Sequence, residues 1–184
     1  MGNGTDEYRR YCEGDDSGLV EIIKEYKDGL ILYLNGFVNN VLIAEELAED
    51  TFVFIGIKKP KDKRISSFKT WLYTIARNIS IDYLRRNSKK KEISIDNCRE
   101  LAEERELETM VICDERKIAI HRALKKLNSN YRQVLILSYF EELSNKEISS
   151  IMKKSLHSVE NLLYRARKAL KEEFERENNN YEKL

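Results

Sequence analysis

Apolar residues recur at steps of three and four along most of this chain, which is the spacing of one helix face. Among 184 residues there are only seven glycines and one proline, so the chain has few of the turn residues that a hairpin-rich sheet requires. The pattern therefore predicts an all-α protein and argues against a β-sandwich. A long amphipathic helix is predicted from Ser17. Its apolar face consists of Leu19, Ile22, Ile23, Tyr26, Leu30, Tyr33, Leu34 and Phe37.

A second helix is predicted to begin near Leu42, and its two faces differ in chemistry. The period places Leu47, Phe52 and Ile55 on the buried face. Like charges one turn apart repel each other on the opposite face, and a basic protein partner would offset that repulsion. A face that is simply solvated is the alternative. The acidic residues of this face are Glu45, Glu46, Glu49 and Asp50.

The middle of the chain is strongly basic. Residues 57–91 carry 12 basic and 2 acidic side chains, whereas residues 1–56 carry 4 basic and 12 acidic ones. Because charge asymmetry reports on partners better than net charge does, the basic stretch is a candidate surface for a polyanion. Residues 58–67 contain the only proline and favour a loop.

A third helix is predicted from about Ser67 to Arg86. In it, Trp71 lies between Lys69 and Arg77, and aromatic rings among cations suit a nucleic-acid strand whose bases are unstacked. Packing of Trp71 in the core is the alternative, because this residue also falls on the apolar stripe of the helix.

The chain is expected to form two helical domains joined by a flexible linker. Residues 17–87 and 116–176 contain the periodic segments, while residues 88–115 are Glu-rich and weakly periodic, as linkers are. Residues 1–16 and 177–184 are predicted to be terminal tails.

Short apolar periods after residue 116 predict four helices, and the last two form a helix-turn-helix. Ser144 and Glu147 have the spacing of a capping box at the start of the first of the two. Lys153, in the turn, occupies a position where such turns often have glycine. The second helix would read DNA in the major groove, and an ordinary helical hairpin with a basic face is the alternative. Side chains positioned for bases or phosphates are Ser158, Glu160, Asn161, Tyr164, Arg165 and Lys168.

Several other classes of protein are disfavoured. No stretch approaches the ~20 apolar residues that span a bilayer, and the polar start of the chain lacks a signal sequence, so a cytoplasmic location is expected. Three widely spaced cysteines and two histidines predict no disulfide framework and no metal site. Because no phosphate loop and no nucleophile or metalloprotease motif occurs, we expect neither an enzyme nor a cofactor.

Three motifs in this order resemble those of bacterial RNA polymerase sigma factors of the extracytoplasmic-function type, in the sigma-70 family. The resemblance spans roughly Asp15 to Phe174. The motifs are AEELAEDTF at 44–52; FKTWLYTIARN at 68–78 with DYLRR at 82–86; and YRQVL at 131–135 with EELSNKEI at 141–148 and YRAR at 164–167.

The resemblance implies that different segments of the chain have different binding functions. The helix containing Glu45, Glu46, Glu49, Asp50 and Phe52 would bind the clamp of the RNA polymerase core enzyme. A promoter-melting domain would capture a flipped base of the minus-10 element, and the helix-turn-helix would bind the minus-35 element. The resemblance also implies an anti-sigma partner, no chemistry of its own and no small-molecule substrate. The residues expected at the minus-10 element are Lys69, Trp71, Ile75, Arg77 and Asn78.

Two rival functions remain at this point. A stand-alone helix-turn-helix regulator would bind duplex operators tightly without polymerase, and a helical adaptor would use neither Asn161 nor Arg165 at any promoter. For a sigma factor, we expect weak DNA binding by the free chain, because its basic and acidic blocks oppose each other.

Overall fold

The structure is a computed structural model that describes residues 4–60, 66–90 and 115–181. Every regular element in these ranges is helical, which confirms the predicted all-α class. The N-terminal unit comprises α1 (Gly4–Cys12), α2 (Ser17–Val38), α3 (Val41–Lys58) and α4 (Phe68–Lys90). The C-terminal unit comprises α6 (Glu115–Lys126), α7 (Ser129–Leu135), the π-helical turn η1 (Ile136–Phe140), α8 (Asn145–Met152) and α9 (Leu156–Tyr181).

Local capping explains where the helices of the N-terminal unit begin and end. The Asn40 side chain accepts a hydrogen bond from the backbone N–H of Ile43 at 3.2 Å and starts α3. Asn39 and Lys59 adopt left-handed backbone conformations, with φ of 51° and 42°, and end α2 and α3.

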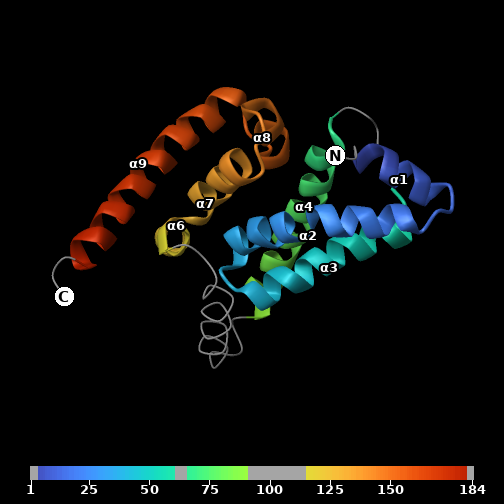
Figure 1. Cartoon of the computed structure of the whole chain (residues 1–184), viewed down its shortest axis with the longest axis horizontal. Helices are drawn as coiled ribbons and strands as arrows, with labels where there is room; N and C mark the ends of the chain where they lie inside the picture. The colour runs from blue at the N-terminus through green and yellow to red at the C-terminus, as the bar shows by residue number, and fades with distance from the viewer. Residues whose placement is uncertain (1–3, 61–65, 91–114, 182–184) are drawn as a thin grey trace.

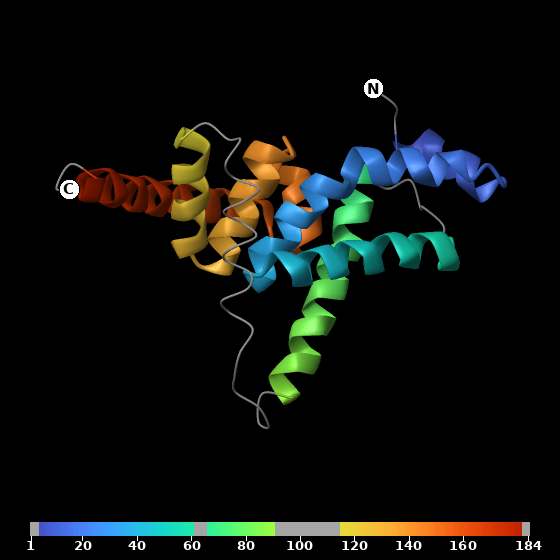
Figure 2. The same ribbon diagram turned by 60° about the horizontal axis from the view of Figure 1, so that its bottom comes forward.

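Helices α2 and α3 run side by side, and α4 crosses them (Figure 1). Figure 2 shows that the C-terminal part of α4 projects away from this pair. In agreement, Ile81 and Leu84 are among the exposed apolar residues, whereas Leu72 and Ala76 near the crossing are fully buried.

Within the N-terminal tail expected over residues 1–16, the structure has α1, which packs against the body of the unit. Its Tyr8 is 5% exposed, and the Tyr8 ring lies 5.6 Å from that of Phe68. The hydroxyls of Tyr8 and Tyr11 donate to the carbonyls of Pro60 and Gly56, both at 2.9 Å. At the other end, α9 continues to Tyr181, beyond the predicted start of a tail at 177.

The C-terminal unit contains the expected helix-turn-helix. The Ser144 hydroxyl accepts from the backbone N–H of Glu147, and the Glu147 carboxylate accepts from the N–H of Ser144, so the capping box is present. Ser155 caps α9 by accepting from the N–H of Ser158 at 3.2 Å. Lys153 ends α8 with a φ of 53°, a conformation that glycine adopts more readily.

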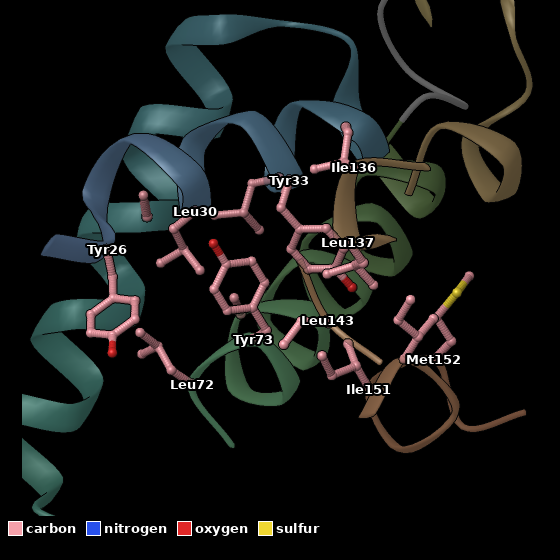
Figure 3. Packing of buried hydrophobic residues seen from close by; sticks show 14 of the residues in the cluster. Tyr26, Leu30, Tyr33, Leu72, Tyr73, Ile136, Leu137, Leu143, Ile151 and Met152 are labelled. Carbon is pink, nitrogen blue, oxygen red and sulfur yellow. The ribbon is translucent and has the colours of Figure 1, made fainter. Parts of the chain in front are cut away.

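The two units share one continuous core. Figure 3 shows Tyr33 and Tyr73 of the N-terminal unit facing Leu137, Leu143 and Ile151 of the C-terminal unit. These units therefore pack directly on each other. The predicted flexible linker falls mostly on residues 91–114, which lie outside the described residues, as do positions 61–65 of the predicted loop. Across the described helices, none is long and apolar enough to cross a membrane.

Candidate functional site

The outer face of α3 carries the acidic residues singled out from the sequence. Glu45, Glu46, Glu49 and Asp50 are all exposed, and none of them forms an ion pair with another described side chain. The mutual repulsion of these carboxylates is therefore not offset within the part of the chain that the structure describes. A partner with basic groups would relieve it.

Phe52 does not lie on this outer face. It is 6% exposed and belongs to the core, as the helical period predicts, so its side chain is not available to a partner. The acidic stripe continues instead into Val53 and Ile57, which are 54% and 74% exposed. Val53 lies seven residues after Glu46 and three after Asp50, and Ile57 lies seven after Asp50, so this spacing could have identified both positions from the sequence.

The five residues expected at the minus-10 element divide between two faces of α4. Trp71, Ile75 and Asn78 follow each other at steps of four and three and share one face, whereas Lys69 and Arg77 are eight residues apart and share another. Trp71 is partly buried, and its ring lies 5.1 Å from that of Tyr8. The Trp71 ring thus contributes to packing and retains some exposed surface.

Two of these five residues are held by the C-terminal unit. The Lys69 ammonium forms an ion pair with Glu141 at 2.8 Å and donates to the Glu141 carbonyl at 2.9 Å. The Asn78 side-chain oxygen accepts from the Lys153 ammonium at 3.1 Å. These contacts could not be predicted from the sequence, because the partners are 72 and 75 residues apart.

The surroundings of the Lys69–Glu141 pair are buried and polar. Glu141 is 8% exposed. Burial raises the pKa of the neighbouring Tyr73 above its usual range, and the Glu141 charge raises it further, so this phenol stays protonated. Arg77 also has a buried Nε atom with no hydrogen-bond partner among the described residues.

The six residues expected at the minus-35 element all lie exposed on α9. Ser158, Asn161, Arg165 and Lys168 follow each other at steps of three and four, and Tyr164, which is 70% exposed, lies beside them. Glu160 flanks this face one turn before Tyr164. The face begins at the N-terminus of α9, where the helix dipole favours anions such as phosphate.

An open hollow at the start of α9 adds two residues that the sequence did not single out. Tyr131 of α7 and His157 line it together with Ser158, Asn161 and Arg165. His157 and Asn161 are hydrogen-bonded at 3.0 Å through His157 Nε2 and Asn161 Nδ2. In the described ranges, no group of three or more His, Cys, Asp or Glu residues could hold a metal ion.

Comparison with known proteins gives matches over both units. Residues 22–90 match Sigma-70 region 2, and residues 117–170 match Sigma-70, region 4. The chain is 32% identical over 153 residues to the ECF RNA polymerase sigma factor SigM of Bacillus subtilis, a match covering 82% of this chain and 91% of SigM. It is 28% identical over 172 residues to SigW of the same organism, covering 88% and 91% of the two chains.

A solved structure has a similar fold. It is the sigma factor RpoE in complex with the anti-sigma factor NepR from Bartonella quintana, with a TM-score of 0.64 and 18% identity. The similarity covers 84% of this chain and 95% of RpoE. At this identity, the likeness concerns the fold alone.

Proposed function

We propose how the surfaces of this chain divide the work of transcription initiation, from the premise that it belongs to the extracytoplasmic-function type of sigma-70 family RNA polymerase sigma factors. As a sigma factor, it binds the polymerase core enzyme and directs initiation at specific promoters. The catalytic chemistry is that of the polymerase, so the chain acts as an initiation factor and not as an enzyme. Its place of action would be the cytoplasm.

The outer stripe of α3 is proposed as the polymerase-binding surface. Its four exposed carboxylates supply the negative charge, and the exposed Val53 and Ile57 supply apolar area at the end of the same stripe. Apolar area bordered by charged groups is a common composition for a protein–protein interface. The partner surface should therefore be basic with an apolar pocket.

The exposed face of α9 is proposed to read the minus-35 element. Arg165 suits guanine, Asn161 suits adenine and Glu160 suits a cytosine amino group, while Lys168 suits a phosphate. On α4, Asn78 and Ile75 are proposed to hold a flipped base of the minus-10 element, with Lys69, Arg77 and Trp71 nearby. Opening the duplex costs a few kcal/mol per unstacked step, which base capture offsets.

The proposal depends chiefly on one observation: the six minus-35 candidates form a continuous exposed face that begins at the capped end of α9.

Purified core polymerase and this protein should be incubated with fragmented DNA of the source genome, and run-off transcripts should be sequenced. We expect new start sites that share two upstream motifs. The absence of any start site that depends on this protein would contradict the proposal.

An anti-sigma factor is proposed as a further partner. The support is the similar fold of RpoE, whose structure was solved with an anti-sigma factor.

A further inference from the structure

A hydrogen bond on the exposed face of α9 joins two side chains that are one helical turn apart. His157 Nε2 and Asn161 Nδ2 lie 3.0 Å from each other. Ser155 caps the first turn of the helix, and the buried Val159 and Leu163 hold this turn against the rest of the C-terminal unit. The two polar side chains therefore project together from a rigid part of the helix, on the face that is proposed to read the minus-35 element.

The contact defines the hydrogen-bonding roles of both groups. An amide nitrogen can only donate, so His157 Nε2 accepts, and the neutral imidazole then carries its proton on Nδ1. The Asn161 amide has two hydrogens, of which one is donated to His157. Asn161 Oδ1 and the second hydrogen have no partner among the described residues, so both are available to a base.

An exposed asparagine without such a contact can present either of two edges to DNA. The last torsion of its side chain is broad and nearly two-fold, so a half-turn exchanges the amide oxygen and nitrogen. With the nitrogen held by His157, the free oxygen and hydrogen form the acceptor and donor pair that adenine N6 and N7 require. With the oxygen held instead, both hydrogens would be free and would suit the acceptors of guanine or thymine.

Arg165 favours the same orientation of the amide. It follows Asn161 by one turn and lines the same open hollow as His157. Because a guanidinium group is a cation that can only donate, it attracts the amide oxygen and repels the amide hydrogens. The acceptor on the preceding turn and the cation on the following turn thus both favour the orientation in which the nitrogen faces His157.

We propose that His157 determines base specificity at the minus-35 element by acting through Asn161. It holds the amide nitrogen, and the free edge of the amide then selects adenine. His157 is thus a positioning residue. The inference rests on the proposed function, in which α9 reads the minus-35 element, and adds to it a residue that sets the sense of one contact. A direct contact between His157 and a phosphate is the alternative, and it would change the affinity for every sequence alike.

Substitutions at position 157 can hold the amide in either orientation. His157→Glu supplies only acceptors, so it should hold the nitrogen as the histidine does, whereas His157→Lys supplies only donors and should hold the oxygen. His157→Ala holds neither atom. The matched controls are Leu156→Glu and Leu156→Lys, which introduce the same charges at a neighbouring residue that is 48% exposed and does not line the hollow.

The test uses the complete protein together with core polymerase. A promoter that the run-off experiment identifies is made into a library, in which each base pair of the upstream motif is varied, and transcripts are sequenced to give the preference for each base. The position that Asn161 reads is the one at which Asn161→Ala removes the preference. Each preference is a ratio within one protein, so an effect of charge on overall affinity cancels.

At that position, we expect the unaltered protein, His157→Glu and both controls to prefer adenine. His157→Ala should lower this preference about fivefold, as expected for the loss of one hydrogen bond, and His157→Lys should shift it to guanine or thymine.

Unchanged preference in both His157→Ala and His157→Lys, or an equal loss of output on every template, would overturn the positioning role. The same shift in Leu156→Lys would overturn it too, because charge alone would then suffice, and so would an Asn161→Ala variant that alters no position. Failure of the proposed function is a separate result: the unaltered protein with core polymerase would yield no transcripts at all.

Discussion

Glu147 connects two parts of the molecule through one carboxylate. It completes the capping box at the start of α8, and it accepts from two hydroxyls at the start of α4. Burial opposes the ionisation of Glu147, but hydrogen bonds from Ser144, Ser67 and Thr70 outweigh it, so the pKa of this carboxyl lies below its ordinary value of 4.5. The ionised form is thus the stabilising one.

The lowered pKa predicts a pH dependence of stability. A carboxyl whose pKa is lower in the folded chain stabilises the fold above its unfolded pKa, and this contribution is lost as the pH falls through the folded value. We expect the Tm of the protein to exceed that of Glu147→Gln near neutral pH, and the difference to shrink below pH 4.5. Circular dichroism melts between about pH 3 and about pH 7 measure it. A difference that stays constant to the acidic limit contradicts this role.

Arg165 is the residue of α9 with the most specific proposed contact. A bidentate pair between arginine and guanine contributes about 1 to 3 kcal/mol, so Arg165→Ala should lower transcription from the protein's own promoters by ~10- to 100-fold. Arg176→Ala, on the same helix, is the control, because Arg176 is paired with Glu173 beyond the proposed reading face. Run-off transcription measures both variants, and equal output from the two would remove Arg165 from the interface.

At the scale of elements, the helical period predicted more of the molecule than charge did. It predicted α2, α3 and α4 and placed Phe52 in the core, and the capping residues predicted the helix-turn-helix. The period missed α1, since nine residues with two buried tyrosines carry too short a pattern. Contacts such as Lys69–Glu141 could not be predicted, because they depend on how two distant segments pack.

Helix α1 should contribute to the stability of the N-terminal unit. Tyr8→Ala removes a buried ring and its hydrogen bond to Pro60, and we expect a loss of about 3 kcal/mol in the free energy of unfolding. Tyr8→Phe removes the hydrogen bond alone, at about 1 kcal/mol. Urea denaturation measures both. If Tyr8→Ala unfolds at the urea concentration of the unaltered protein, α1 does not pack as described.

The outer stripe of α3 should bind polymerase through its apolar end as well as its carboxylates. Ile57→Ser changes a residue that is 74% exposed, so the Tm should not change, whereas affinity for core polymerase should fall about tenfold. Val20→Ser, at an α2 residue that is 64% exposed, is the matched control and should bind normally. Biolayer interferometry on immobilised core enzyme compares them. Equal affinities for the two variants would exclude Ile57 from the interface.

At the scale of the whole molecule, the two units carry surfaces with different partners and also cover part of each other. The acidic stripe of α3 and the reading face of α9 are exposed, while Lys69 and Asn78 on α4 contact the C-terminal unit. We propose that polymerase bound to the α3 stripe makes promoter binding possible, because the basic and acidic blocks of the free chain oppose each other.

Binding of one promoter fragment, measured by mobility shift and permanganate reactivity with and without core polymerase, tests this account most directly. The fragment should come from a start site that the run-off experiment identifies. We expect a shifted complex with reactive thymines near the minus-10 element only when this protein and core polymerase are both present. Tight, salt-sensitive binding of the fragment by this protein alone, with no further effect of polymerase, would contradict the account and favour a stand-alone regulator.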